Sequence, residues 1–206
     1  EKTDWPVNGQ SIGVHHAIVH NDRAYAGFWG GGMLILDISD PSKPGLITHT
    51  KWKPGEGGST HTAMPLPKRN LLVVTDESTA DDCKEEPRRV RLFDISDEKK
   101  PRLVSMFPEP RGNFCERGGR FGPHNVHENR PGAYCSDRFI YVTYFNAGLR
   151  VFDIDDPKNP QEIAYYLPPC PQNQKTIQTN DVFVAENGLI FISDRLNGGI
   201  DILEMV

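Results

Sequence analysis

One pattern occurs four times along the chain and constrains the fold more than any other feature. Each copy has a short apolar run, a turn, and a second apolar run. The second runs are MLILDISD, VRLFDISD, LRVFDIDD and IDILEMV, which begin at residues 33, 90, 149 and 200. A recurring unit of this kind packs on copies of itself, so the chain is predicted to be a repeat protein.

Runs before and after this core complete a unit of four strands. Apolar and polar residues alternate along them, as in strands with one buried face. Asp37 and Asp94 are each followed by Ile, Ser and a second Asp, and then by Pro41 directly or Pro101 a few residues later, a combination that favours a turn. An antiparallel unit of four strands and roughly 45 to 60 residues is typical of a β-propeller blade. We therefore expect an all-β propeller built from four-stranded antiparallel blades.

The blades are expected at about residues 13–53, 60–108, 123–168 and 179–206. The first three contain all four strands, whereas the last stops after its third strand, at Val206. Residues 1–12 are a poor candidate for the strand that would complete it. Four blades is the low end for a closed ring. We therefore expect the C-terminal part of a larger ring, completed by a missing N-terminal segment or by a second chain. The alternative is a small propeller that closes by itself or as a dimer.

Composition argues against several classes of function. The net charge of −5 and the lack of a basic stripe disfavour a nucleic-acid partner. No run approaches the roughly 18 apolar residues that a membrane span needs. No GxSxG motif, phosphate loop or regular calcium loop occurs. The chain opens without Met or a signal-peptide pattern, so its N-terminus does not indicate a localisation.

Long loops are predicted on one face of the propeller, and function on such scaffolds tends to lie in these loops. They are residues 53–60, 77–89, 107–123 and 168–178. A Cys83–Cys115 or a Cys115–Cys170 disulfide is sterically conceivable there, whereas Cys135 on the opposite side should be free. Loop disulfides would favour a periplasmic or secreted protein, and the alternative is four unrelated thiols.

Histidines recur where the innermost strand of each blade begins. The aligned residues are His16, His61, His124 and, in the fourth blade, Asn180. Equivalent positions in a radial repeat converge on the axis, where imidazoles can bind a divalent transition metal such as iron, zinc, copper or manganese. Three protein ligands with an open position is the arrangement of catalytic metals. A register slip of one or three residues would substitute His15 or His127. Alternatively, the histidines are structural and bond to neighbouring blades.

A second ring of residues is expected where the second strands end, around the same channel mouth. The aligned pairs are Phe28 and Trp29, Asp76 and Glu77, Tyr144 and Phe145, and Asp194 and Arg195. With Asn180, the residues Trp29, Tyr144, Phe145, Asp76 and Asp194 would form a substrate pocket. Glu77, Arg195 and Glu128 are candidates for assisting catalysis or for orienting a histidine. The simpler interpretation is that the aromatic residues pack between blades and that Asp194 pairs with Arg195.

Segments such as LRVFDIDDPKNPQEI and LILDISDPSKPGLI resemble those of the LVIVD-repeat β-propeller proteins over nearly the whole chain. More distantly, the chain is similar to the selenium-binding protein and methanethiol oxidase propellers. These resemblances imply a ring of about seven blades. The second also implies a metal-linked oxidase, and carotenoid-cleaving propellers hold iron with axial histidines. His16, His61 and His124 match that axial pattern, and Asn180 departs from it.

Two functions follow as hypotheses. The first is a metal-dependent enzyme, an oxidoreductase, lyase or hydrolase, that acts on a small organic molecule at the channel mouth. The second is a non-catalytic propeller, secreted or on the cell surface, that binds a protein or glycan and whose histidines are structural. Fold resemblance does not decide between them.

Overall fold

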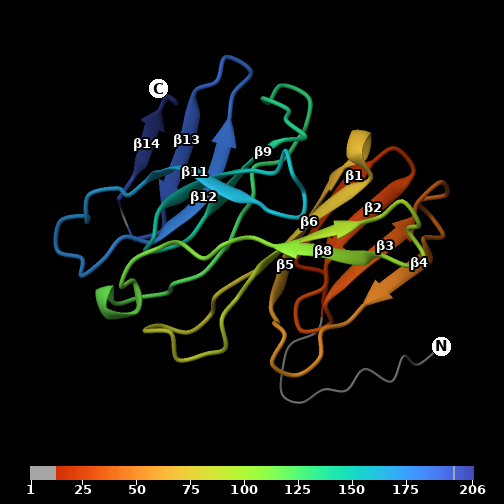
Figure 1. Cartoon of the computed structure of the whole chain (residues 1–206), viewed down its shortest axis with the longest axis horizontal. Coiled ribbons are helices and arrows are strands. Elements are labelled where there is room, and N and C mark those ends of the chain that lie inside the picture. The colour runs from red at the N-terminus through yellow and green to blue at the C-terminus, as the bar shows by residue number, and fades with distance from the viewer. Residues whose placement is uncertain (1–12, 197) are drawn as a thin grey trace.

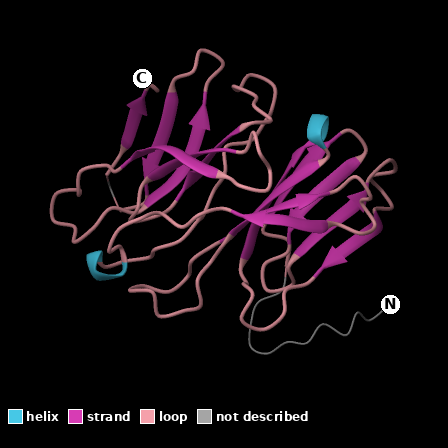
Figure 2. Ribbon diagram, viewed as in Figure 1, coloured by secondary structure: helices cyan, strands magenta, loops and turns pink. Residues whose placement is uncertain are grey.

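The computed structural model describes residues 13–196 and 198–206, and nearly all regular structure in them is β-strand (Figure 2). Two short 3-10 helices lie in loops, η1 (Pro67–Arg69) and η2 (Cys115–Arg117). The strands are β1 (His16–His20), β2 (Arg23–Gly27), β3 (Met33–Asp37), β4 (Gly45–Thr50), β5 (Thr60–Leu66), β6 (Leu71–Asp76), β7 (Val90–Asp94), β8 (Arg102–Met106), β9 (Phe139–Thr143), β10 (Leu149–Asp153), β11 (Gln161–Tyr166), β12 (Thr179–Val184), β13 (Ile190–Asp194) and β14 (Ile200–Leu203).

These strands form four antiparallel sheets in which each strand pairs with the next one along the chain. Blade one is β1 to β4, blade two is β5 to β8, blade three is β9 to β11 and blade four is β12 to β14. Blades one and two lie on the right of Figure 1, and blades three and four on the left. The repeated antiparallel meander confirms the predicted all-β propeller architecture.

The core lies between blades because neither face of one small sheet is covered by the sheet itself. Successive strand residues point to opposite faces, so in β6 Val74 packs toward blade one and Val73 toward blade three. Val74 belongs to a cluster with Ile35, and Val73 to one with Val142. A third cluster joins blades three and four through residues such as Val151. Three interfaces of this kind hold the four blades in order.

The predicted first strand of blade three is wrong in detail. The structure has only an isolated bridge there, between Val126 and Val142, with backbone hydrogen bonds at His124 and His127. The His127 ring donates from Nε2 to the Tyr134 carbonyl oxygen, 2.8 Å away. This bond ties the segment to its own following loop, so the pairing ends after one bridge and the three regular strands are β9 to β11.

The outer faces of the first and last blades expose large apolar side chains. Val19 and Leu46 of blade one are both 62% exposed, and Ile200 and Ile202 of blade four are 69% and 62% exposed. Such faces are unusual for a monomeric soluble domain. The prediction made for residues 1–12 lies outside the described residues.

A disulfide joins two of the long loops. Cys83 bonds to Cys115, the first of the two predicted pairings, while Cys135 and Cys170 are free and exposed. The bridge connects the loop after β6 with the loop after β8. Within the described part of the chain, no helix has the length and apolar character needed to cross a membrane.

Candidate metal centre on the propeller axis

A β-bulge near the start of the first strand determines which side chains reach the axis. In β5, Thr60 pairs with Asp76 and Thr62 pairs with Thr75, so His61 is the extra residue. A bulge bends the strand and re-aims its side chains. In β12 the same irregularity leaves Asn180 extra.

The same geometry recurs in blades one and three. The amide of His15 donates to the Gly27 carbonyl oxygen while His16 pairs with Gly27, so both residues oppose one partner. In blade three the amide of His124 donates to Thr143, whose own amide donates to Asn125. Strand pairing thus aligns four residues, His15, His61, His124 and Asn180. His15 occupies the position that the sequence alignment gives to His16, which is the alternative that a register slip of one residue predicts.

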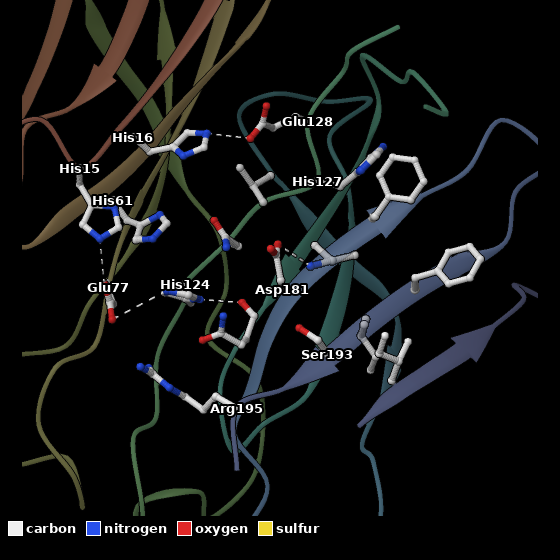
Figure 3. Close-up of a pocket in the computed structure, with 18 of the residues that line it drawn as sticks. His15, His16, His61, Glu77, His124, His127, Glu128, Asp181, Ser193 and Arg195 are labelled. Carbon is white, nitrogen blue, oxygen red and sulfur yellow. Dashed lines mark hydrogen bonds and ion pairs between the residues drawn. The ribbon is translucent and has the colours of Figure 1, made fainter. Parts of the chain in front are cut away.

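These three imidazoles lie together around one carboxylate (Figure 3). The ring centroids of His15 and His61 are 4.0 Å apart, and those of His61 and His124 are 4.4 Å apart. Glu77 lies between the outer two, with Oε2 3.8 Å from His15 Nε2 and Oε1 3.8 Å from His124 Nε2. Ligand atoms of His15, His61 and Glu77 all lie within 4.8 Å of one another. Ligands about 2.1 Å from a tetrahedral ion lie about 3.4 Å apart, so small side-chain rotations would bring these three donors around one metal ion.

Hydrogen bonds to Nδ1 leave a free ring nitrogen on two of these histidines. His124 donates from Nδ1 to the Asn180 carbonyl oxygen, 2.6 Å away. A carbonyl oxygen can only accept, so the lone pair of the neutral ring is on Nε2, which points toward Glu77. His61 Nδ1 lies 2.7 Å from the Thr62 hydroxyl, and when that hydroxyl accepts from Nδ1–H the lone pair of the His61 ring is on Nε2. Such outer contacts orient metal-binding histidines.

Burial keeps His61 and His124 neutral. Desolvation, followed by the repulsion of the neighbouring His124 and His15, lowers the pKa of His61 to about 2. Burial also lowers the pKa of His124, although its bond to Asn180 and the charge of Glu77 oppose that shift. Because metals bind the deprotonated ring, both residues are ready to bind an ion at neutral pH.

Arg120 holds Glu77 in place. Glu77 is only 6% exposed, and Arg120 Nη1 donates to its Oε1 over 2.9 Å. The guanidinium also lies over the ring of Phe145. Arg120 comes from the long loop 107–123, and no sequence motif marked it. Its only sequence signal is its position in a loop predicted on the functional face.

His16 has a different partner. Its Nε2 lies 2.7 Å from Glu128 Oε1, and this bond raises the pKa of His16 and lowers that of Glu128. The resulting ion pair joins blade one to the segment before blade three. Figure 3 shows the pair of His16 and Glu128 above the cluster of His15, His61 and Glu77, so the carboxylates of Glu128 and Glu77 lie apart. Glu128 is therefore a partner of His16 in this structure.

Both ring nitrogens of His127 are used by the backbone. Nε2 donates to the Tyr134 carbonyl oxygen, and Nδ1 accepts from the Val184 amide, 3.2 Å away. The ring therefore has no lone pair to offer a metal, and it links blade three to blade four. Burial lowers its pKa and keeps it neutral, as these two bonds require.

An open cavity of about 640 Å³ contains the cluster. Blade four supplies much of its opposite wall, including Asn180 and Asp181 from β12 and Ser193 from β13. Arg195 follows β13 and also lines the cavity. Of the residues expected in a substrate pocket, Asn180 lies in this cavity.

The two aromatic residues that follow β2 and β9 hold adjacent blades together and touch the cluster. Trp29 and Phe145 both have left-handed backbones, with φ of 37° and 36°, and each bridges to the first residue of the next blade. The Trp29 ring stacks on His15 at 5.0 Å, and the Phe145 ring lies 4.8 Å from His124. Strained non-glycine backbones cluster at functional sites. Phe145 is fully buried, and its ring packs against that of His124.

Three other predicted pocket residues lie away from the cavity. Tyr144 is 3% exposed within the core between blades two and three. Asp76 is fully buried and pairs with Arg91 over 2.7 Å. Asp194 accepts backbone hydrogen bonds, including one from Gln178, and stabilises a turn.

A profile of the LVIVD repeat matches residues 17–50 and 134–167, which are most of blade one and all strands of blade three. The chain contains LVIVD repeats. This match confirms the resemblance inferred from the sequence. Blades two and four lie outside the matched residues and have the same antiparallel order of strands. A comparison with curated proteins gave no match.

Solved structures similar to this LVIVD-repeat chain are β-propellers or proteins of the same architecture. The β-propeller domain of Cps50 (Swd1) from Myceliophteria thermophila has 12% identity and a TM-score of 0.63, covering 96% of this chain and 55% of that one. A hypothetical selenium-binding protein from Sulfolobus tokodaii has 13% identity and a TM-score of 0.63, covering 90% and 47%. The periplasmic gluconolactonase of Pseudomonas aeruginosa has 11% identity and a TM-score of 0.57, covering 89% and 49%. At such identities the likeness shows the fold alone, and this chain spans about half the length of each.

Proposed function

We propose that this chain forms the metal-binding part of a β-propeller enzyme that acts on a small organic molecule in the axial cavity. The observation that carries the proposal is the placement of Glu77 between His15 and His124, each 3.8 Å from its carboxylate, with His61 beside them. Three imidazoles and one carboxylate suit zinc, iron, manganese or copper. A metal bound there would polarise a substrate or lower the pKa of a bound water.

The protein residues around the cluster have separate tasks under this proposal. Arg120 fixes the orientation of Glu77, and Phe145 supports the ring of His124. The Asn180 side chain occupies the fourth equivalent position and is not an imidazole, so a ligand could reach the ion from the cavity side as a fifth donor. These groups suit a metal-dependent oxidoreductase, lyase or hydrolase equally well, and the proposal includes all three classes of enzyme.

We also propose that the exposed faces of blades one and four are covered by further blades, from another segment of the protein or from a second chain. Val19 and Leu46 on one face and Ile200 and Ile202 on the other are apolar and open to solvent. The similar propellers are about twice as long as this chain, which supports the proposal. A closed ring would also limit solvent access to the axial cavity.

Metal analysis of the purified chain tests the central proposal. We expect about one equivalent of a divalent transition metal, with His61→Ala and His124→Ala each reducing affinity at least tenfold. His20→Ala is a surface control that should bind metal normally. His127→Ala should lower stability and leave the metal stoichiometry unchanged, since both nitrogens of that ring serve the backbone. Equal metal content in all four variants would refute the site and favour a non-catalytic interaction propeller.

A further inference from the structure

Arg195 is a cation beside the proposed metal, and no carboxylate in the described part of the chain pairs with it. Its backbone amide donates to the Gln178 carbonyl oxygen over 3.0 Å, which fixes the residue just after β13. Its guanidinium lies over the Phe145 ring, with Cζ 5.6 Å from the ring centroid. Within residues 13–196 and 198–206, the guanidinium makes no hydrogen bond or ion pair to a carboxylate.

The contrast with Arg120 shows what that free guanidinium offers. Arg120 lies over the same Phe145 ring, also at 5.6 Å, but it is bonded to Glu77 and to the Ser78 carbonyl oxygen. Arg120 therefore completes the protein side of the cluster. Arg195 lines the cavity with its donors unused, and Figure 3 shows its side chain extending below His124 and Glu77. Its charge is close enough to His124 to act against protonation of that ring.

The charge balance of the centre favours an anionic ligand. A divalent ion held by neutral imidazoles and the Glu77 carboxylate keeps one net positive charge, and Arg120 and Arg195 each add another beside the Phe145 ring. Guanidinium groups bind carboxylates through paired, charge-assisted hydrogen bonds. A ligand that places one oxygen on the metal from the cavity side and another at Arg195 would satisfy both charges.

We infer that the cavity takes a small organic carboxylate, bound jointly by the metal and by Arg195. This inference rests on the proposed function, because it needs the metal centre. It assigns Arg195 to substrate binding and separates its role from that of Arg120. Asp181 lines the same cavity on the blade-four wall, so the anionic group should bind at the Arg195 end and not beside β12.

The test uses the chain loaded with Co²⁺, whose visible absorption reports both metal binding and ligand binding. Benzoate is the probe, and benzamide is its neutral counterpart. We expect benzoate to change the spectrum with saturation and benzamide to have no effect. Arg195→Met should weaken benzoate binding at least tenfold, and Arg195→Lys should have an intermediate effect because a lysine lacks the paired donors. Co²⁺ affinity should change less than about threefold in both variants, because Arg195 is not a ligand.

The outcomes separate the two proposals. If Co²⁺ binds and Arg195→Met binds benzoate as the wild type does, the carboxylate inference is wrong and the metal centre stands. Equal spectral responses to benzoate and benzamide would also overturn the carboxylate inference and leave the metal centre standing. If Co²⁺ does not bind, or if it binds with the same stoichiometry in His61→Ala, the metal centre is wrong and the carboxylate inference fails with it.

Discussion

Removing the Cys83–Cys115 disulfide should lower stability by an amount that follows from the loop it closes. The two cysteines are 32 residues apart. In the chain-entropy description, a crosslink over that separation reduces the entropy of the unfolded chain and contributes about 3.7 kcal/mol at 25 °C. We therefore expect the double change Cys83→Ser and Cys115→Ser to reduce the free energy of unfolding by about 3–4 kcal/mol.

The folded loops should keep their shape without the bridge. Glu85 accepts hydrogen bonds from the Ser78 hydroxyl and from the amides of Thr79 and Ala80, and these bonds hold the loop after β6. The Asp82 amide also donates to Gly119 over 2.9 Å, across the two loops. The cost therefore arises mainly from the unfolded chain, which gains freedom.

Urea denaturation followed by tryptophan fluorescence measures the effect, with linear extrapolation to water. The matched control is Cys135→Ser with Cys170→Ser, two exposed free thiols whose replacement should change stability by less than about 0.5 kcal/mol. The m-value of the bridge variant should rise because its unfolded state exposes more surface. A loss below about 1 kcal/mol, or one equal to that of the control, would refute the entropic reasoning.

Three further predictions use the same denaturation assay. In metal-free protein, the pKa of about 2 keeps His61 neutral in the folded state, while the same ring becomes protonated in the unfolded state below about pH 6.5. Between pH 6.5 and about pH 4.5 the free energy of unfolding should therefore fall by up to about 2.7 kcal/mol more in the wild type than in His61→Gln. Arg91→Met should cost about 3–5 kcal/mol because it leaves the Asp76 carboxylate buried and unpaired, and adding Asp76→Asn should recover part of this loss. Gly148→Ala should be costlier than Gly132→Ala: both have positive φ, but only the first Cβ would meet a carbonyl oxygen, at 2.2 Å. The His61 argument is contradicted if the stability difference between the wild type and His61→Gln does not change with pH. The other two are contradicted if Arg91→Met is as stable as the wild type, or if the two glycine variants lose equal stability.

Strands and their order could be predicted from sequence because the signals are local. The turn after β3 contains Asp37, whose carboxylate accepts the Ser39 amide over 2.9 Å, and the turn after β7 repeats this bond between Asp94 and Ser96. Short polar side chains act within two or three residues, so a repeated motif reports a repeated turn. The prediction of a first strand in blade three failed because the bond of His127 to the Tyr134 carbonyl oxygen ends the strand pairing after one bridge. No local sequence pattern contains a contact with that later loop.

The identity of the cluster residues could be predicted only in part. Sequence alignment gives His61 and His124 because each is the single histidine at its strand start, whereas blade one offers both His15 and His16. The bulge selects between these two, and a bulge is defined by pairing with another strand. Arg120 had no signal because its loop reaches Glu77 through the tertiary fold.

The departures from the repeat are what make the axial position suited to chemistry. Four equivalent imidazoles would surround an ion symmetrically and leave no side of it facing a ligand. Instead, blade four places Asn180 there, and its backbone carbonyl accepts the bond that orients His124. Glu77 then enters from the end of β6, a position where blade one has Trp29 and blade three has Phe145. The repeat thus brings three imidazoles to one point, Glu77 adds a carboxylate, and Asn180 in place of a fourth imidazole leaves the cavity side open to a ligand next to Arg195.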